Sequence, residues 1–218
     1  MKGIIQELKC LLKTKSIGTD SDQALLLDFQ AALETKPEKA IKLEKDALAQ
    51  IESITADNAH LVSNIHANLG GLYRMNGHPA LAREHMKKSI SLLDQFNLLH
   101  INDSIPQIAN YAMFLTEQQE PERGTSELQK LSGIIKEYHS DECLDYAKVQ
   151  ETLGTIYLMT ANLPQAKTHF KRAFKIYEKI WADEPEMIEA KYQEIQELYP
   201  QVGCFLGQQI STFLTKQL

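Results

Sequence analysis

Asparagine amides are the side chains in this sequence whose spacing best suits binding chemistry. Asn68 and Asn110 are separated by 42 residues, and each amide offers two hydrogen-bond donors and one acceptor. A row of such amides can hold the backbone of a peptide independently of its side chains. The amides can equally bond a carbonyl of a neighbouring helix and tie two parts of the chain together. The sequence leaves both roles open.

Histidine spacing gives little indication of a metal site. His78 and His85 lie seven residues apart, about two helical turns, but Pro79 separates them and places His78 in a turn. His85 and His169 are separated by twice the interval between the two asparagines, and we expect their shared position to mark the outer surface of a helix. We therefore predict neither a metal ion nor a cofactor.

Cysteine usage and motif content argue against catalysis. Cys143 stands beside Asp141 and Glu142, and acidic neighbours disfavour the thiolate that nucleophilic attack needs. The sequence has no glycine-rich phosphate loop, nucleophile elbow or HExxH motif, so we expect a protein that is not an enzyme. Cys10, Cys143 and Cys204 lie far apart, which favours a reducing compartment and hence the cytoplasm.

The composition is typical of a helical globular protein. The 218 residues are 43% hydrophobic and 24% charged, a balance that supports a hydrophobic core. With 29 acidic against 23 basic residues, the formal net charge of −6 disfavours nucleic-acid binding. No stretch reaches the roughly 20 apolar residues that a membrane-spanning helix needs. Ten Gly and seven Pro are too few for a turn-rich all-β chain.

The elements that position these side chains repeat along the chain. Pro37, Pro79 and Pro121 follow one another at intervals of 42 residues. The same shift aligns a column of large apolar residues, namely Leu27, Leu69, Tyr111, Leu153 and Ile195. It also aligns a column of small residues, namely Ala40, Ala82, Gly124 and Ala166. Apolar residues recur at helical spacing inside each unit, so each unit is predicted to be two helices, with the proline just inside the second.

Stacking of these units predicts the fold. A single helical hairpin cannot bury its apolar face alone, whereas stacked hairpins share one core. We predict an all-α, right-handed superhelical solenoid of antiparallel helix pairs, forming a single domain over residues 1–218. Its parts are a capping helix at 1–17, hairpins at 21–54, 63–96, 105–138 and 147–182, and a degenerate repeat with a C-terminal cap at 186–218. Gly70 and Gly154 mark close approaches of two helices, and Pro164, one residue late, predicts a different turn.

Two motifs resemble a known family. Leu69-Gly70-x-x-Tyr73 and Leu153-Gly154-x-x-Tyr157 are similar to the signature of the tetratricopeptide repeats. A standard unit has about 34 residues, and the longer unit of this chain resembles the repeats of kinesin light chains and their bacterial relatives. The resemblance implies a non-catalytic scaffold that binds a peptide or protein segment in a concave groove.

The groove residues also follow from this resemblance. In the family, the first helix of each hairpin lines the concave surface, and Asn68 and Asn110 match an asparagine that contacts ligand in kinesin-light-chain-like repeats. The residues expected to face the groove are Asn64, Asn68, Gly71, Arg74, Met75, Asn110, Met113, Glu117, Lys148, Glu151, Thr152, Thr155 and Met159. The lysine and asparagine pattern that binds a C-terminal carboxylate is not reproduced, because Leu25 and Phe29 occupy the places where it would begin.

Two other functions remain open beside the scaffold. The chain could be a sensor in which a bound peptide changes the superhelical pitch, or an accessory subunit that recruits substrates for an enzyme on another polypeptide. The terminal helices, Ile4 to Leu12 and Phe205 to Leu214, could also pair between copies. We therefore expect a monomer or a weak homodimer, a protein or peptide partner, and no insertion into a membrane.

Overall fold

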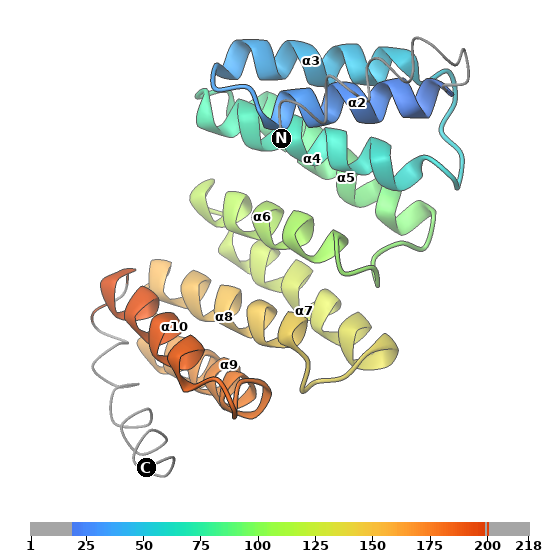
Figure 1. Cartoon of the computed structure of the whole chain (residues 1–218). Helices are drawn as coiled ribbons and strands as arrows, with labels where there is room; N and C mark the ends of the chain where they lie inside the picture. The colour runs from blue at the N-terminus through green and yellow to red at the C-terminus, as the bar shows by residue number, and fades with distance from the viewer. Residues whose placement is uncertain (1–18, 199, 201–218) are drawn as a thin grey trace. The chain divides into compact units, whose positions relative to one another are not determined.

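All regular structure that the computed structural model describes is α-helical (Figure 1). The described residues are 19–198 and 200. The helices are α2 (Asp20–Ala32), α3 (Pro37–Gln50), α4 (Ala59–Met75), α5 (Pro79–Gln95), α6 (Ser104–Glu117), α7 (Pro121–Tyr138), α8 (Leu144–Met159), α9 (Leu163–Ile180) and α10 (Pro185–Leu198). The capping helix predicted at 1–17 and most of the C-terminal cap lie outside the described residues.

The helices pair as the 42-residue period predicts. The hairpins predicted at 21–54, 63–96, 105–138 and 147–182 correspond to α2/α3, α4/α5, α6/α7 and α8/α9, and α10 follows in the phase of a first helix. Pro37, Pro79 and Pro121 each begin the second helix of their hairpin, as predicted. Pro164 is the second residue of α9, and there the Asn162 side chain caps the helix by accepting from the Gln165 backbone N–H at 3.3 Å.

The turns inside three hairpins repeat in conformation as well as in sequence. Each contains one residue with a positive φ, and these residues are 42 apart: Gly77 at 75°, Gln119 at 64° and Ala161 at 57°. In each turn the next backbone N–H donates to a carbonyl five residues earlier: His78 to Tyr73, Glu120 to Leu115 and Asn162 to Tyr157. This bond is the signature of a Schellman helix end. The non-glycine residues at two of these positions explain why the turn is hard to recognise from the sequence.

Glycines lie where two helices of one hairpin approach closely. A Cβ added at Gly70 would meet Met86 Cγ at 2.5 Å, and one added at Gly154 would meet the Phe170 ring at 2.8 Å. A Cβ added at Gly124 would meet the Ala112 carbonyl oxygen at 2.6 Å. The close approach predicted from the small-residue columns is therefore confirmed.

Backbone contacts divide the chain into two compact units, Met1–Tyr111 and Ala112–Leu218, with the boundary inside α6. In the first unit α4 packs on α5, α2 on α3 and α3 on α4. In the second unit α8 packs on α9, α7 on α8 and α9 on α10. The single continuous domain over 1–218 stays a prediction. None of the helices within the described residues has the length and apolar character that crossing a membrane requires.

Candidate binding site

A pocket of about 140 Å³ lies between α4, α5 and α6 in the first unit. It is lined by Ala67, Gly71, Arg74, Met75, Met86, Ser89, Gln107 and Asn110. Four of these, Gly71, Arg74, Met75 and Asn110, are residues expected to face the groove. We call this hollow the α4–α6 pocket.

The α4–α6 pocket combines an apolar lining with amide groups. Ala67 and the buried Met86 contribute apolar surface, and the Met75 side chain is 81% exposed at the edge. Nothing lies within 4 Å of a Cβ built at Gly71, so the pocket is open above this residue. Asn110 adds an exposed amide from α6. The pocket can therefore take a small apolar side chain while an amide bonds the backbone beside it.

A buried hydrogen-bond network fixes one wall of the α4–α6 pocket. Gln107 Oε1 accepts from the hydroxyls of Ser63 at 2.8 Å and Ser89 at 2.5 Å. Gln107 Nε2 donates to Asn64 Oδ1. All but Asn64 are buried. Asn64, expected to face the groove, is thus part of the contact between α4 and α6.

Asn68 bonds a side chain of a neighbouring helix, and its contact with a ligand stays a prediction. Its Nδ2 donates to Asp28 Oδ1 at 2.9 Å, which ties α4 to α2 of the preceding hairpin. The residue 40 positions before Asn110 is Gly70, which has no side chain to accept such a bond. The two asparagines of one column therefore have different neighbours, and Asn110 is the one at the pocket.

The bond from Asn68 belongs to a buried carboxyl cluster. Glu44 of α3 is 1% exposed and lies against Asp28. Burial, together with the nearby Asp28 charge, raises the pKa of the Glu44 carboxyl to about 8, while the Asn68 bond lowers it. Burial also raises the pKa of Asp28. At neutral pH Glu44 is therefore mostly protonated, and a neutral acid lies at the junction of α2, α3 and α4.

The repeated histidines do not lie on an outer helix surface, contrary to the expectation from their spacing. His85 Nδ1 is 2.9 Å from His66 Nδ1, and the His85 ring stacks on Tyr73 with centroids 5.4 Å apart. His169 makes the equivalent contacts two repeats later. Its Nδ1 lies 2.9 Å from Gln150 Oε1, and its ring stacks on Tyr157 with centroids 5.2 Å apart.

These histidines connect the two helices of their hairpins. Burial is the main cause that lowers the pKa of His66 to about 4 and the pKa values of His85 and His169 below their usual range. His66 and Gln150, the partners of His85 and His169, are also two repeats apart. This shared spacing of both members of each pair was the feature of the sequence that could have indicated the contacts. Within residues 19–198 and 200, no three His, Cys, Asp or Glu side chains are grouped closely enough to hold a metal ion.

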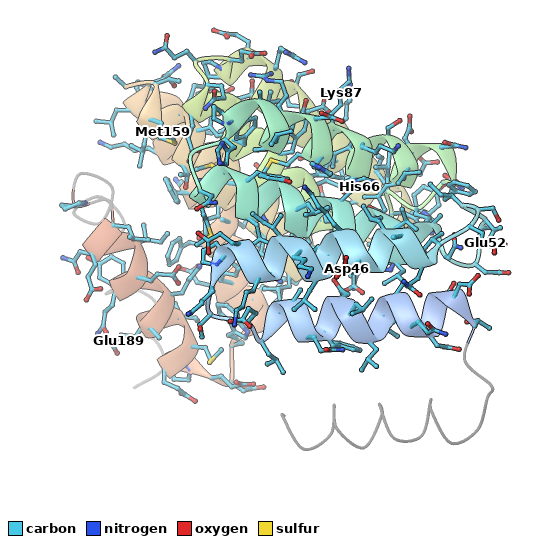
Figure 2. All side chains as sticks on the ribbon, turned by 90° about the horizontal axis from the view of Figure 1, so that it is seen from above. Asp46, Glu52, His66, Lys87, Met159 and Glu189 are labelled. Carbon is cyan, nitrogen blue, oxygen red and sulfur yellow. The ribbon has the colours of Figure 1, made fainter. Side chains whose placement is uncertain are left out.

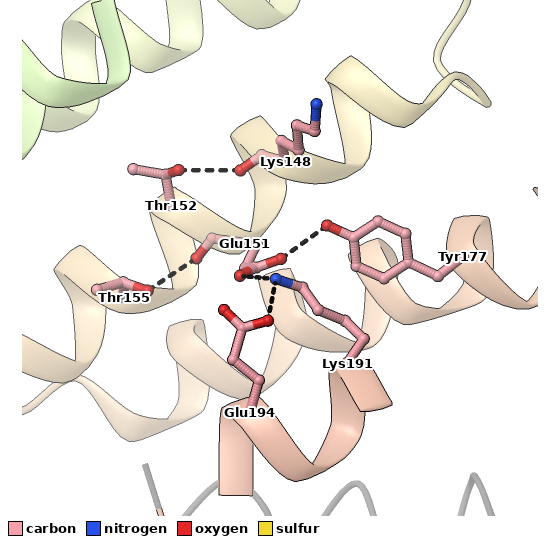
Figure 3. Close-up of polar contacts among 7 residues, drawn as sticks. All are labelled: Lys148, Glu151, Thr152, Thr155, Tyr177, Lys191 and Glu194. Carbon is pink, nitrogen blue, oxygen red and sulfur yellow. Dashed lines mark hydrogen bonds and ion pairs between the residues drawn. The ribbon is translucent and has the colours of Figure 1, made fainter. Parts of the chain in front are cut away.

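In the second unit, Glu151 holds three helices together (Figure 3). The Tyr177 hydroxyl of α9 donates to Glu151 Oε2 at 2.7 Å, and Lys191 Nζ of α10 lies 2.9 Å from Glu151 Oε1. The same Lys191 also pairs with Glu194 at 3.0 Å. Burial and the Glu151 charge raise the pKa of the Tyr177 phenol, so the hydroxyl remains a donor.

The other groove residues predicted in the second unit differ in exposure. Thr155 is only 8% exposed, contrary to the expectation that it faces the groove, because α8 turns this position into the helix contacts and its hydroxyl bonds the Glu151 carbonyl at 3.1 Å (Figure 3). The Thr152 hydroxyl bonds the Lys148 carbonyl at 2.9 Å. Lys148 is exposed, and Met159 is 47% exposed on the surface of α8 (Figure 2). On α6, Met113 is half-buried and Glu117 exposed.

Comparison with known proteins supports the resemblance inferred from the motifs. Residues 104–179 match the model of the tetratricopeptide repeat family. No curated protein matches the sequence at a significant level. The resemblance to tetratricopeptide repeats is confirmed over residues 104–179, and the all-α, tetratricopeptide-like fold class is confirmed by the solved structures that follow.

Three solved structures share the fold. BtubC (BKLC) from P. vanneervenii has 17% identity and a TM-score of 0.72, covering 98% of this chain and 87% of its own. Nearly identical TPR-like repeats of a Podosopora anserina putative kinesin light chain have 14% identity and a TM-score of 0.63, covering 82% and 90%. MamA has 16% identity and a TM-score of 0.55, covering 82% and 89%.

Proposed function

We propose that the chain is a non-catalytic scaffold that binds a peptide or protein segment along its first helices, because residues 104–179 match the tetratricopeptide repeat family. The coarse part of this function, an interaction scaffold for protein partners, accords with the family match. The peptide contact is the finer proposal. It centres on the α4–α6 pocket, where Asn110, Arg74, Met75 and Gly71 converge.

The convergence of four groove residues on one hollow carries the proposal. A pocket of about 140 Å³ is large enough for one small apolar side chain of a ligand. Asn110 provides both donors and an acceptor for the ligand backbone at that point. Since Gln107 is fixed by Ser63 and Ser89, the wall of the pocket is rigid before a ligand arrives, which reduces the entropy lost on binding.

The second unit has its own set of exposed and half-buried residues on first helices. Lys148, Thr152 and Met159 on α8, with Met113 and Glu117 on α6, offer a mixed polar and apolar surface. The mixture of charges favours a ligand recognised by shape and backbone bonds over one recognised by net charge. We assign this surface to further contacts with the same class of peptide.

A screen with a random peptide library displayed on phage tests the proposal. Gly71→Leu fills the open space above Gly71 and should remove binding of the enriched peptides. Gly133→Leu on α7 is the matched control, because a Cβ there also meets nothing within 4 Å, and should retain binding. Peptides that bind both variants and the wild type equally would contradict an anchor in the α4–α6 pocket.

We also propose a protein of the reducing cytoplasm that is a monomer or a weak homodimer and binds no nucleic acid. The widely spaced cysteines and the net charge of −6 support these assignments. Light scattering of the full chain over a range of concentrations measures the mass. A stable, concentration-independent oligomer would contradict the proposed state.

A further inference from the structure

Among the helices that the structure describes, α9 is the most basic, in a chain whose formal net charge is −6. Of its 18 residues, five are Lys or Arg and one is Glu. Four of the cations, Lys171, Arg172, Lys175 and Lys179, recur at helical spacing along one exposed face. The equivalent positions two repeats earlier, on α5, are Lys87, Lys88, Ser91 and Gln95, so the long basic stripe is particular to α9.

A hollow of about 180 Å³ lies on this face of α9. Its lining combines Arg172, Lys175 and Lys179 with Ile176 and with Asp141 and Glu142 from the segment that joins α7 to α8. Lys136, at the end of α7, adds a cation beside it, since this lysine lies 3.6 Å from Asp141. We call Lys136, Lys171, Arg172, Lys175 and Lys179 the α9 basic face.

Two of these cations are held in place by one aromatic ring. Arg172 lies over the Tyr146 ring at 5.3 Å from its centroid, and Lys136 lies over the same ring at 5.4 Å. Tyr146 is buried in the second unit. The cations are therefore preorganised on a rigid support, which reduces the entropy lost when they bind an anion.

The segment that joins α7 to α8 shows which chemistry this face accepts. Glu142 forms an ion pair with Lys179, and Asp141 pairs with Lys136. All four side chains are 44–62% exposed, and exposed ion pairs of this kind contribute little to stability. A short turn with two adjacent carboxylates thus already lies against the face, in contacts weak enough to be exchanged.

We propose that the α9 basic face docks an Asp- and Glu-rich segment of a partner protein, whose carboxylates displace Asp141 and Glu142 from Lys136 and Lys179. The apolar Ile176 in the hollow accepts a short aliphatic side chain between the acidic ones. This surface lies outside the α4–α6 pocket and belongs to the second unit alone, so it does not depend on the groove function.

The two carboxylates in the hollow favour a peptide over a uniformly charged surface. A membrane or a nucleic acid presents negative charge along its whole length and meets Asp141 and Glu142 with repulsion. A peptide can place its carboxylates opposite the lysines and an aliphatic residue opposite Ile176. The face accordingly selects a pattern of charges and not a charge density alone.

Fluorescence anisotropy with a labelled ten-residue peptide of alternating Glu and Asp around one Leu tests the proposal. We expect measurable binding that weakens as salt rises from about 50 to about 200 mM, since exposed charges are screened. Lys175→Glu/Lys179→Glu should weaken the affinity by about tenfold or more. Asp141→Asn/Glu142→Gln removes the internal competitor and should strengthen it severalfold.

The matched control is Lys87→Glu/Lys88→Glu on α5. It changes the net charge by the same amount at the positions equivalent to Lys171 and Arg172, and Lys87 lies exposed on α5 (Figure 2). This control should bind the peptide like the wild type, and circular dichroism checks that each variant is folded. Equal losses in both charge reversals would show attraction to overall charge and overturn the proposal. So would absence of peptide binding in the wild type and in Asp141→Asn/Glu142→Gln, or binding of phosphatidylserine vesicles in its place.

Discussion

Gln107 on α6 and Lys191 on α10 stand at the same position of two first helices that are two repeats apart. Gln107 reaches back to α4 and α5 and bonds buried hydroxyls. Lys191 reaches back to α8 and pairs with Glu151, with both side chains 18–19% exposed. One position thus joins successive hairpins by a neutral buried network in the first unit and by a half-buried ion pair in the second.

The difference follows from the residues that each side chain meets. The positions of Ser63 and Ser89 in the first unit correspond to Ala147 and Ala173 in the second, and the position of Ala67 corresponds to Glu151. In the first unit, the amide of Gln107 can bond both serine hydroxyls. In the second unit, the two alanines offer no polar side-chain group, and Lys191 bonds the carboxylate of Glu151 instead. The repeat sets where a side chain points, and its neighbours set what it bonds.

Gln107→Ala gives the largest expected effect on this comparison. The substitution removes the oxygen that accepts from both serine hydroxyls, which then keep only the bond to each other and the bond from Ser63 to the Ser89 carbonyl. It also leaves a cavity at a buried contact. We expect the free energy of unfolding to fall by about 3 kcal/mol. Lys191→Ala should lower it by less than about 1 kcal/mol, because its partner carboxylate can be hydrated. Urea denaturation followed by circular dichroism measures both, and equal losses would remove the distinction between the two junctions.

The glycines at equivalent positions of α4 and α8 give the next largest effect. Gly154→Ala places a Cβ 2.8 Å from the fully buried ring of Phe170, whereas Gly70→Ala places one 2.5 Å from Met86 Cγ and within 3.3 Å of the backbone of Met86 and Ala82. We expect Gly154→Ala to lower the free energy of unfolding by about 2 kcal/mol, and Gly70→Ala to cost about 1 kcal/mol more, because backbone atoms cannot move aside as a side chain can.

Gly71→Ala is the control for both, since a Cβ there meets nothing within 4 Å. It should raise the free energy of unfolding by up to about 1 kcal/mol, the helix preference of alanine over glycine. Thermal unfolding of the three variants ranks them. A smaller loss for Gly70→Ala than for Gly154→Ala would show that Met86 and the backbone of α5 move aside more easily than the ring of Phe170.

The 42-residue period predicts the helices of this chain well because each element depends on many positions. Every hairpin combines a proline, a small column and several apolar residues, so a single exception such as Pro164 leaves both the turn and the start of α9 in register. The different turn predicted from Pro164 is therefore wrong. The close approaches at Gly70 and Gly154 were predictable for the same reason. Because the pattern recurs four times, one residue that departs from it does not change the predicted helices.

Polar pairs are less predictable because each depends on one partner residue. Asn68 and Asn110 share a column, yet only Asn68 meets a carboxylate, since Asp28 is replaced by Gly70 one repeat later. Thr155 follows the helical projection but is buried by its neighbours. The sequence identifies the candidate positions, and the three-dimensional neighbours decide which of them remain on the surface.

Glu44→Gln removes one carboxyl of the Glu44–Asp28 pair in the first unit. The second unit has no such pair, because the equivalent positions are Leu128 and Ala112. Glu44 keeps its proton in the folded protein up to about pH 8, whereas the unfolded chain loses it near 4.5. The folded state therefore binds more protons in this window, and its stability falls as the pH rises from 4.5 to 8. Because glutamine is neutral and can still donate to Asp28, we expect the melting temperature at pH 8 to rise by about 4 °C, roughly 1–2 kcal/mol.

The exposed acid Asp46 on the same helix supplies the control (Figure 2). Asp46→Asn should leave the melting temperature within about 1 °C at every pH, since substitutions on the surface have small effects. Melting curves at pH 5, 6.5 and 8 distinguish the two. If the melting temperature of Glu44→Gln were raised by the same amount at all three pH values, the stabilisation would not come from the titration of the Glu44 carboxyl.

The smallest expected effect comes from exchanging the equivalent pairs His66–His85 and Gln150–His169 between the two units. His66→Gln turns the first pair into the second and should change the free energy of unfolding at pH 7 by no more than about 0.5 kcal/mol, because the bond to His85 is kept.

The pKa of His66, lowered to about 4 from 6.5, makes the unfolded state bind more protons between these values. Its contribution to stability is therefore complete above pH 6.5 and is lost as the pH falls towards 4. His66→Gln should flatten the fall in stability over this window, and Gln150→His should steepen it by introducing a buried histidine beside His169. Urea midpoints at pH 4.5, 5.5 and 7 measure both slopes, and slopes that move in the same direction would show that the two pairs are not interchangeable.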